Sequence, residues 1–572
     1  MNSYTLLSVK GDKKKLNIKK KCFENKIVYI KDIQLRQSTK IILENRNIIS
    51  YEEIKSFLFP SLSNLYNPFL LKDMDIAVDR IIRAISKKER IFVVGDYDTD
   101  GVTSTSLLLK FFQELGIDAY FYIPKRDNGY GLSLDAIKRA IEYKAKLLIT
   151  VDNGITSLNE VEFAKTVGID VIVTDHHEPQ DELPKAYAVV NPKRKDSKFP
   201  FRELSGVGVA FNLVMALRNK LRSMNFFDTN NQPNLKKYLD LVALGTLADI
   251  VPLLDENRIC VKFGLSNEGP SCVGLESLKK VSGINGSLTS RNVGFSIAPR
   301  INAAGRLYDA SIVVDMFMKD NKEEAEEIAN RLDEINKERR RLQTQIVSEI
   351  EKDIENVNDS VIVASKKGWH RGVIGIAAST ISYKYSKPTI IISEMDGLSV
   401  GSGRSASNID LFSCVLETSD ILERFGGHKM AVGITIKNEL IDTFRDKINE
   451  IVEERYGEQE SIGGYDVDCE TSLNIFDRSF LEELSKLEPY GPSNEEPLFL
   501  VRHALIKDKT MILNKYPKYL VSDGDVSIWM VAFEQGINLD VGYVYDIVFT
   551  AKMNNNYMSF TIKDAFLSKL RG

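Results

Sequence analysis

The amino-acid sequence has 572 residues, which is too long for one hydrophobic core, so about three domains are expected. A net charge of −4 excludes a chain that is basic throughout, and any surface for a polyanion must be a local patch. The sequence contains neither an apolar run of about 18 residues nor an apolar leader, which excludes a membrane span and a signal peptide. The five cysteines are scattered and form no CxxC pair. They exclude a disulfide framework and a zinc site and indicate a reducing compartment, the cytoplasm.

The first 90 residues precede the strongest motif. Residues 1–35 are expected to be a basic appendage with lysine triplets at 13–15 and 19–21. We interpret it as a solvated arm, and an electrostatic contact to nucleic acid is the alternative. Residues 36–90 show helical periodicity broken by Pro60 and Pro68, which predicts a helical lead-in to the first domain.

The stretch 91–106, IFVVGDYDTDGVTSTS, predicts a buried parallel strand followed by a cluster of acids. Asp96, Asp98 and Asp100 repel one another, and a cation is the simplest way to neutralise them. Their spacing matches the start of an EF-hand, but the twelfth position is Leu107 instead of glutamate, so a calcium loop is rejected. A solvated acidic turn is the remaining alternative. The position at the carboxyl end of a parallel strand favours a binding site.

Strands and helices alternate from residue 91 to about 192, which predicts a doubly wound parallel sheet. The expected strands are 91–94, 119–123, 147–151, 170–174 and 187–190, and the expected helices lie near 102–115, 134–143 and 157–167. Asp152 follows the third of these strands, and Asp175-His176-His177 follows the fourth. Carboxylates and imidazoles therefore gather on one rim of the sheet. Asp249 adds another acid at the end of a predicted helix over 238–248.

These residue types are the ligands that divalent cations prefer. Carboxylates with one or two imidazoles suit Mn²⁺ or Mg²⁺, and histidine favours Mn²⁺. Four or five acids exceed the need of one ion but suit two ions about 3.5–4 Å apart, bridged by one carboxylate. Because the chain has no GxxxxGK[ST] loop, a nucleotide-driven motor is disfavoured. The pattern indicates metal-dependent hydrolysis of a phosphoester.

The remaining sequence divides into three parts. Residues 320–357 are highly charged and lack glycine and proline, which predicts one long connector helix, with a coiled coil as the rival. Residues 358–457 predict a smaller α/β domain with three glycine-rich turns suited to phosphate, at 368–379, 401–405 and 426–429. These turns carry His370, Arg404 and His428. Residues 460–572 predict five strands and an OB-like barrel, in which Trp529, Phe533, Tyr545, Phe549, Tyr557 and Phe560 divide between core and base stacking.

Four ordered motifs resemble those of the DHH phosphoesterase superfamily: GDYDTDG at 95–101, VDNG at 151–154, TDHHEP at 174–179 and GTLADIVPL at 245–253. The fuller pattern resembles the RecJ family of single-strand-specific DNA exonucleases, from about residue 40 to about residue 565. Supporting stretches are IPKRDNGYGL at 123–132, APRINAAGRL at 298–307, GWHRGVIGIAAS at 368–379, GSGRS at 401–405 and FGGHKMAVG at 425–433.

The resemblance implies a role for each site residue. The metal ligands are Asp98, Asp100, Asp152, His176 and Asp249, with Asp152 bridging two Mn²⁺ or Mg²⁺ ions. Asp96 assists nearby, and His177 faces the scissile phosphate, either as a catalytic residue or as a residue that supports the metal ligands. Val94 replaces a histidine found in many superfamily members, so the first metal is expected to be held less tightly. The implied substrate-binding residues are Arg126, Ser402 and Arg404 at the 5′-phosphate, with Arg300 and Arg306 lining the cleft.

The implied fold is α/β: a parallel-sheet DHH domain and a smaller DHH-associated domain joined by a long helix, followed by the barrel. The expected domains are 36–319 with its helical lead-in, 320–357, 358–457 and 460–572, after the appendage at 1–35.

The implied function is 5′ to 3′ hydrolysis of single-stranded DNA to mononucleotides, in DNA repair and recombination. The expected partners are single-stranded DNA, a single-strand-binding protein and a helicase, with no membrane, and the chain is expected to be a monomer. One rival is an oligonucleotide or cyclic-dinucleotide phosphodiesterase of the same superfamily. The non-enzyme rival is an inactive replication scaffold, which the complete ligand set disfavours.

Overall fold

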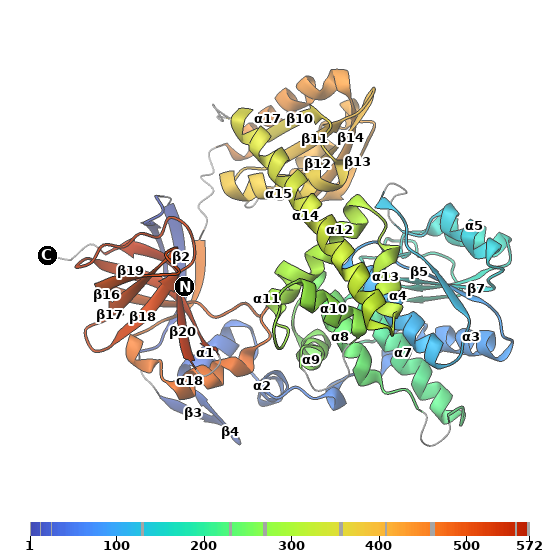
Figure 1. Ribbon diagram of the computed structural model, residues 1–572, viewed down its shortest axis with the longest axis horizontal. Coiled ribbons are helices and arrows are strands. Elements are labelled where there is room, and N and C mark those ends of the chain that lie inside the picture. Colours follow the sequence, from blue (N-terminus) through green and yellow to red (C-terminus); the bar gives the residue numbers. More distant parts are fainter. Residues whose placement is uncertain are drawn as a thin grey trace.

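The computed structural model shows two α/β lobes joined by a long helix, with a β-rich module beside them (Figure 1). It describes residues 2–11, 13–23, 26–126, 131–227, 232–266, 272–353, 359–406, 409–457, 464–554 and 557–568. We call the two α/β parts the first lobe (α3 to α13) and the second lobe (β10 to α17). The barrel module comprises β1–β4, α1, α2, β15–β20 and α18. Within the described residues, no helix combines the length and apolar character needed to cross a membrane.

The first lobe is built on the parallel sheet that the sequence predicts. Its order is β6-β5-β7-β8-β9, with all neighbours parallel. The strands are β5 (Ile91–Val94), β6 (Ala119–Tyr122), β7 (Leu147–Val151), β8 (Asp170–Thr174) and β9 (Ala188–Val190). The prediction of a doubly wound sheet is confirmed, and the strand limits agree to within one residue.

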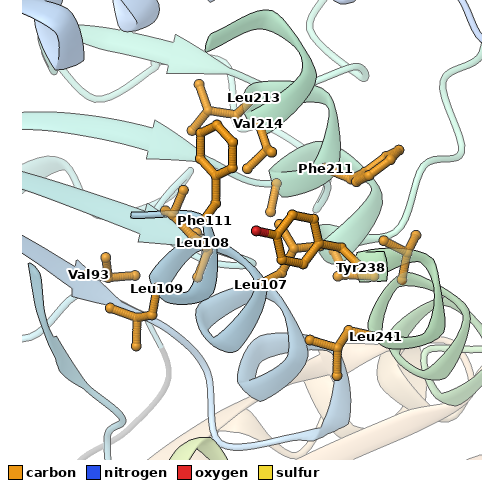
Figure 2. Packing of buried hydrophobic residues seen from close by; sticks show 14 of the residues in the cluster. Val93, Leu107, Leu108, Leu109, Phe111, Phe211, Leu213, Val214, Tyr238 and Leu241 are labelled. Carbon is orange, nitrogen blue, oxygen red and sulfur yellow. The ribbon is translucent and has the colours of Figure 1, made fainter. Parts of the chain in front are cut away.

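Alternate residues of β5 enter different cores, which explains why the whole strand is apolar. Ile91 and Val93 pack with α3 (Met74–Ser86), α4 (Thr99–Glu114) and α7 (Gly206–Ser223). Figure 2 shows this face, with Val93 beside Leu109 of α4 and the side chains of α7 on the other side of Phe111. Phe92 and Val94 pack on the other face, against α5 (Leu134–Glu142) and α6 (Leu158–Thr166). The lobe is completed by α8 (Leu239–Ala248), α9 (Asp255–Gly264), α10 (Val273–Val281), α12 (Ala298–Leu307) and α13 (Ser311–Met318).

The connector is α14 (Lys322–Asp353), a single helix of 32 residues that runs between the lobes (Figure 1). Ala325, Ala329 and Leu332 at its start belong to the core of the first lobe. Ile346 and Ile350 near its end belong to a core of the second lobe. Opposite ends of one helix therefore anchor in different lobes. The last residues of the expected connector, 354–357, lie outside the described residues.

The second lobe has a five-stranded sheet in the order β10-β11-β12-β14-β13. Its strands are β10 (Ile362–Lys367), β11 (Thr389–Glu394), β12 (Leu398–Arg404), β13 (Arg424–His428) and β14 (Ala431–Lys437). The helices are α15 (Arg371–Tyr385), α16 (Leu411–Leu416) and α17 (Ile441–Tyr456).

Two of the three glycine-rich segments in this lobe are strands and not the expected turns. Residues 401–404 lie in β12, and 426–428 lie in β13. A Cβ on Gly401 would approach Ile434 to 2.6 Å, and one on Gly403 would approach Val432 to 2.5 Å. These glycines therefore serve close packing on the core face of the strand, while Ser402 and Arg404 alternate onto the face covered by α15. The prediction of turns was wrong because the glycines were interpreted as turn residues, whereas in these strands they allow close packing.

The barrel module contains the expected closed barrel of five strands. The order β16-β17-β18-β20-β19 closes through pairing of β19 with β16. Its strands are β16 (Phe499–Ile512), β17 (Tyr516–Ser522), β18 (Ser527–Ala532), β19 (Val544–Asn554) and β20 (Tyr557–Leu567).

The N-terminal residues are not a solvated arm. β1 (Asn2–Leu7) and β2 (Lys13–Lys21) extend the barrel sheet, and β2 pairs in parallel with β15 (Gly464–Glu470). Leu16 and Ile18 are buried against the barrel, so the lysine runs are the polar positions of an amphipathic strand. The alternating pattern of a strand is hard to recognise in the sequence here, because only two apolar residues lie between the lysine triplets.

The helical lead-in also divides between two parts of the molecule. Apolar residues of α1 (Gln37–Asn45) and α2 (Tyr51–Leu58) share a core with the barrel and with α18 (Arg478–Leu484). The short hairpin of β3 (Ile27–Ile30) and β4 (Ile33–Arg36) leads into α1. The later part of the lead-in, from Leu62 through α3, packs in the first lobe. The two ends of the chain thus form one module, and the expected limit at residue 36 does not separate structural units.

Candidate active site

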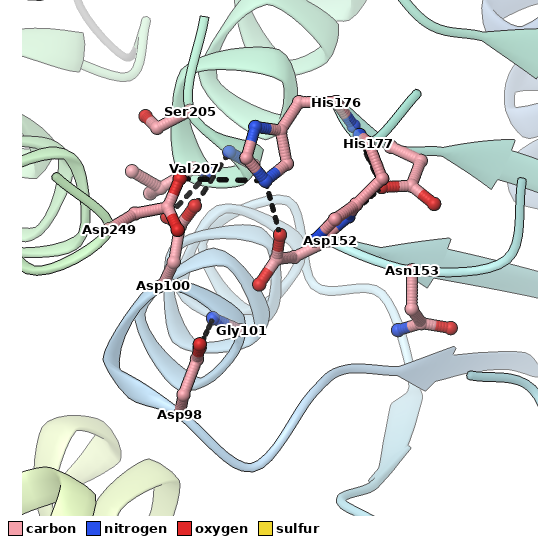
Figure 3. Close-up of polar contacts among 12 residues, drawn as sticks. Asp98, Asp100, Gly101, Asp152, Asn153, His176, His177, Ser205, Val207 and Asp249 are labelled. Atoms are coloured by element: carbon pink, nitrogen blue, oxygen red, sulfur yellow. Dashed lines mark hydrogen bonds and ion pairs between the residues drawn. The ribbon is translucent and has the colours of Figure 1, made fainter. Parts of the chain in front are cut away.

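The predicted acids and histidines converge at the carboxyl ends of the strands of the first lobe (Figure 3). Asp98 and Asp100 follow β5, Asp152 follows β7, and His176 follows β8. Asp249 joins them from the C-terminal end of α8. The Nε2 atom of His176 lies 3.2 Å from Oδ1 of Asp152 and 3.5 Å from Oδ2 of Asp249. These five side chains form one largely buried group. Together with Asp96, we call them the acid group.

The acid group contains two sets of three potential ligands, each with its ligand atoms within 4.8 Å of one another. The first set is Asp100, His176 and Asp249, and the second is Asp96, Asp98 and Asp152. Asp152 also forms a set with His176 and His177, so it lies between both groups. This arrangement can hold two ions with Asp152 between them. It also gives Asp96 the position of a ligand, beyond the assisting role expected from the sequence.

Two helix N-termini and two glycines hold the carboxylates in place. Asp98 accepts a hydrogen bond from Gly101 at 3.0 Å and caps α4. Asp100 accepts from the N–H groups of Gly206 at 2.7 Å and Val207 at 2.9 Å, at the start of α7. Such N–H groups favour negative charge. A Cβ on Gly206 would lie 2.4 Å from Oδ1 of Asp152, so only glycine fits there.

Gly245 has a similar role on α8. A Cβ there would lie 2.6 Å from Oδ1 of Asp100, which is fully buried in the same place. Neither Gly206 nor Gly245 was predicted from the sequence. The one available signal was that Gly245 interrupts an apolar helix, where glycine is otherwise unfavourable, whereas Gly206 is the first residue of its helix.

The acid group is strongly repulsive without cations. Burial and the charge of Asp98 raise the pKa of Asp96 and the pKa of Asp249 to about 7. Burial and neighbouring carboxylates raise the pKa of Asp100 and of Asp152 well above the usual value. Asp152 also has a φ of 61°, a left-handed conformation that non-glycine residues rarely adopt.

The donor set fits divalent cations. Oδ1 of Asp96 and Nε2 of His176 are buried and have no hydrogen-bond partner among the described residues. Burial, with the charge of His177, lowers the pKa of His176 to about 3, so the ring stays neutral, as a metal ligand must be. Bound cations would satisfy both atoms and neutralise the carboxylates.

His177 is oriented by a carboxylate that was not predicted to belong to the site. Its Nδ1 atom lies 2.7 Å from Oδ1 of the fully buried Asp175. Asp175 also accepts hydrogen bonds from the backbone N–H groups of His176, His177 and Ile155. Burial alone would lower the pKa of His177, but the hydrogen bond to Asp175 and the charges of the nearby carboxylates together raise that pKa. This pair fixes the ring and directs Nε2 away from Asp175.

The acidic loop after β5 rests on α12. Oδ1 of Asn302 accepts from the N–H of Thr99 at 2.9 Å and from its hydroxyl at 2.8 Å. Gly305 packs on the carbonyl of Tyr97, where a Cβ would come within 2.4 Å. Asn302 is therefore a positioning residue inside the APRINAAGRL stretch, in which the sequence pointed only to the two arginines.

Three of the predicted substrate-binding arginines lie near one another at the junction of the lobes. The Arg126 guanidinium stacks 4.6 Å from the ring centre of Tyr97, inside the acidic loop. Arg306 donates to the carbonyl of Gly372 at 3.3 Å, at the start of α15. Arg404 donates to the hydroxyl of Ser402 at 3.1 Å. The side chains of Ser402 and Arg404 lie against Gly375 of α15, where a Cβ would come within 2.9 Å of the Ser402 hydroxyl and 3.1 Å of Nη2 of Arg404.

A fourth arginine completes what we call the arginine group: Arg126, Arg306, Arg339 and Arg404. Burial and the charges of Arg126, Arg339 and Arg404 lower the pKa of Arg306 to about 10. Arg339 lies on the connector helix, where it donates to Asn336 and Gln343. Across the described residues, no carboxylate forms an ion pair with any of the four. In the sequence, Arg339 stands out only as an interruption of the apolar stripe.

Arg300, His370 and His428 have other surroundings. Arg300 forms an ion pair with Asp333 of α14 at 2.8 Å, which ties α12 to the connector. His370 is the N-cap of α15 and accepts from Gly372 at 3.1 Å, next to the Arg306 contact. His428 ends the exposed edge strand β13 and accepts from Met430 at 3.3 Å. Of these three, only His370 lies beside the arginine group.

Three family models match successive parts of the chain. They are the DHH family N-terminal domain at residues 90–246, the DHHA1 domain at 358–454 and the RecJ OB domain at 467–563. A Haemophilus influenzae protein named single-stranded-DNA-specific exonuclease RecJ is 36% identical over 472 residues, covering 80% of this chain and 82% of the relative. The chain belongs to the RecJ family.

Other RecJ relatives extend the comparison. The Bacillus subtilis protein of the same name is 38% identical over 504 residues, 86% of this chain, and the chain spans 62% of that longer relative. The crystal structure of Thermus thermophilus RecJ in complex with Mn²⁺ has a TM-score of 0.77 and 28% identity, covering 93% of this chain and 76% of that one. A structure of exonuclease RecJ bound to manganese has a TM-score of 0.60 and 32% identity, over 70% and 97% of the two chains.

Proposed function

We propose that this chain is a metal-dependent exonuclease that hydrolyses single-stranded DNA from its 5′ end and releases mononucleotides. One arrangement carries the proposal: two ligand sets with Asp152 between them lie in the first lobe, and arginines from both lobes gather at the lobe junction. The first group suits two Mn²⁺ or Mg²⁺ ions, and the second suits a terminal phosphate.

Each group of side chains has a distinct task. Asp96, Asp98 and Asp152 would hold one ion, and Asp100, His176 and Asp249 the other, with Asp152 between them. When bound, the ions activate water and stabilise the charge of a phosphoryl transition state. His177, whose ring is oriented by Asp175, would give a proton to the departing 3′ oxygen. Arg126, Arg306 and Arg404 with Ser402 would hold the 5′-phosphate by forked hydrogen bonds, with His370 beside them.

The barrel supplies a surface for the rest of the strand. Tyr545, Phe549 and Phe560 are core residues, whereas Trp529, Phe533 and Tyr557 are exposed. Lys518 lies 5.3 Å from the ring centre of Trp529, and Tyr516 packs edge-on against Phe533. Aromatic rings interleaved with lysines on one face of β17 and β18 are typical of single-strand binding. A substrate of two or three nucleotides would not need this surface.

We assign the functional units as the first lobe with the metals, the connector, the second lobe over 358–457, and the barrel module with the N-terminal strands. We place the activity in the cytoplasm, in DNA repair and recombination, with the chain acting as a monomer. A single-strand-binding protein and a helicase are the proposed protein partners.

The test is digestion of single-stranded DNA labelled at either end, with Mn²⁺, scored for product size over time. We expect a 5′ label to appear at once as a mononucleotide, while a 3′ label shortens progressively. Products that start from the 3′ end would contradict the polarity. Cleavage confined to dinucleotides would favour the small-substrate phosphodiesterase, and no cleavage with Mn²⁺ or Mg²⁺ would favour the inactive scaffold.

A further inference from the structure

Three consecutive polar residues are almost completely buried in α9. Glu256, Asn257 and Arg258 are 1%, 2% and 1% exposed. Arg258 is among the largest fully buried side chains of the molecule. Charged residues are rarely buried without a specific partner. None of the three belongs to the acid group or to the arginine group, so their burial needs another explanation.

The Arg258 guanidinium donates five hydrogen bonds, and all of them go to main-chain carbonyls of the barrel module. Nε donates to Phe57 at 3.1 Å, Nη1 to Leu487 at 3.0 Å and Pro489 at 3.2 Å, and Nη2 to Lys486 at 2.9 Å and Glu488 at 3.0 Å. The guanidinium also lies 3.8 Å from the ring centre of Phe57. Among the described residues, no carboxylate forms an ion pair with Arg258. One side chain of the first lobe thus binds two separate segments of the barrel module.

The loop that receives Arg258 is braced on its own side. The side chain of Asn494 donates to the carbonyls of Leu487 and Pro489 at 2.8 and 2.9 Å. The N–H of Leu253, at the entry to α9, donates to Pro492 at 2.8 Å, and Lys262 donates to Glu488 at 3.0 Å. Figure 1 shows α9 on the side of the first lobe that is next to α2. The contact is a built interface and not a chance approach of two surfaces.

The neighbours of Arg258 tie the same turn of α9 to the helices that hold the metal ligands. Glu256 accepts from the side chain of Asn212 in α7 at 3.2 Å. Asn257 donates to the carbonyl of Glu203, in the segment that enters α7, at 2.6 Å. The start of α7 holds Asp100, and the helix before α9 ends at Asp249. One turn of α9 therefore connects the barrel module to the helices that position two of the proposed metal ligands, Asp100 and Asp249.

We propose that Arg258 is a positioning residue that aligns the barrel with the metal site, so that a strand bound on the barrel enters the site in register. The inference rests on the proposed function. A binding surface raises the occupancy of a second site only when the link between them holds the correct geometry. Loosening this link should therefore weaken the use of long strands and leave chemistry on very short substrates intact.

The experiment compares the full chain with its Arg258→Lys and Arg258→Met variants on two substrates with Mn²⁺. One is a single strand long enough to reach the barrel, and the other is a dinucleotide. We expect KM for the long strand to rise about tenfold in Arg258→Met, because an aligned second site adds at least that factor. We expect kcat, and kcat/KM on the dinucleotide, to change less than about twofold. Arg258→Lys should recover part of the loss, since lysine keeps the charge but has fewer donors in one plane.

Arg218→Met is the matched control. Arg218 is a part-buried arginine of α7 that donates to the carbonyl of Pro233 at 3.3 Å within the first lobe. It should lower stability without changing the ratio of long to short substrates. An unchanged ratio in both Arg258 variants would overturn the inference, as would an equal loss on both substrates. Failure of the unaltered chain to degrade single strands would instead overturn the proposed function.

A disulfide provides a second test that does not depend on how Arg258→Met folds. A Cβ on Gly491 would lie 3.5 Å from the Cβ of Leu253, a spacing that a disulfide accepts. The pair Leu253→Cys and Gly491→Cys, added to Arg258→Lys, should restore the low KM for the long strand when oxidised and lose it again on reduction. No redox-dependent change in KM would count against alignment as the role of Arg258.

Discussion

The acid group and the arginine group are two places where like charges cluster, and they are built in different ways. Five of the six members of the acid group follow strands of one sheet, within a single lobe. The arginine group draws one residue each from the segment after β6, from α12, from α14 and from β12. The first group is thus local to one sheet, whereas the second exists only when both lobes and the connector are in place.

The difference predicts different responses to ligands. The carboxylates have to be neutralised whether or not substrate is present, so cations should contribute to the stability of the first lobe. The arginines can keep their charge, since the pKa of Arg306 falls only to about 10. The arginine group would bind an anion, the terminal phosphate of the substrate, that arrives and leaves with each turnover. Variants in the first group should change both metal binding and chemistry, and variants in the second should change only the handling of the DNA end.

The largest effect is expected from Asp152→Asn, which removes the charge that lies between the two ligand sets. We expect kcat to fall at least about a thousandfold, because metal-ion stabilisation supplies several kcal/mol. We also expect the Mn²⁺-induced rise in Tm to shrink, while the metal-free protein is no less stable. Substantial turnover at saturating Mn²⁺ would contradict the shared role of Asp152.

Arg404→Ala tests the second group. A charge-assisted contact contributes about 1.5–3 kcal/mol, so we expect a loss of about ten- to a hundredfold on 5′-phosphorylated strands and little loss on 5′-hydroxyl strands. Arg404→Lys should recover part of it, since lysine lacks the planar fork. The Mn²⁺-induced rise in Tm should be unchanged, which separates this variant from Asp152→Asn. Equal slowing on both ends would move the end sensor to Arg126.

The stability of the metal-free protein should depend on pH with a sign opposite to that of a salt-bridged acid. The pKa values of Asp96 and Asp249 are about 7 in the folded protein, whereas unfolded aspartates ionise near pH 4. Between these values the folded state holds protons that the unfolded chain releases, so stability falls as the pH rises. We expect the Tm of EDTA-treated protein to fall between about pH 5 and pH 7, and less so in Asp152→Asn. A Tm that rose over this range would refute the predicted repulsion.

The smallest effect on turnover is expected from Arg300→Met. Because Arg300 is paired with Asp333, its loss should lower Tm and leave the preference for a 5′-phosphate within about twofold of the unaltered chain. Arg306→Met, one turn and a half further along the same helix, should reduce that preference. If the two variants behaved alike, the arginine group would not be distinct from its surroundings.

The sequence by itself determined the sheet of the first lobe and the identity of its acids. Apolar strands of four or five residues ending in Asp or His are local patterns, and parallel strands carry their carboxyl ends to one edge. That rule alone brought Asp98, Asp152 and His176 together. The sequence predicted that the aromatic residues of the barrel divide between core and surface, but not which residue lies where.

Only the tertiary structure decided which residues from distant segments meet. Two apolar residues, Leu16 and Ile18, are too few to predict a strand, which forms because β2 pairs with β15. Gly401 and Gly403 predicted a turn, but they lie in a strand where Ile434 and Val432 pack too closely for a larger side chain. Arg258 carries no local signal, and Arg339 shows only as a break in an apolar stripe, since an arginine on a helix is most often solvated. Their roles come from the groups packed around them, at positions far away in the chain, and periodicity reports only on neighbours a few residues apart.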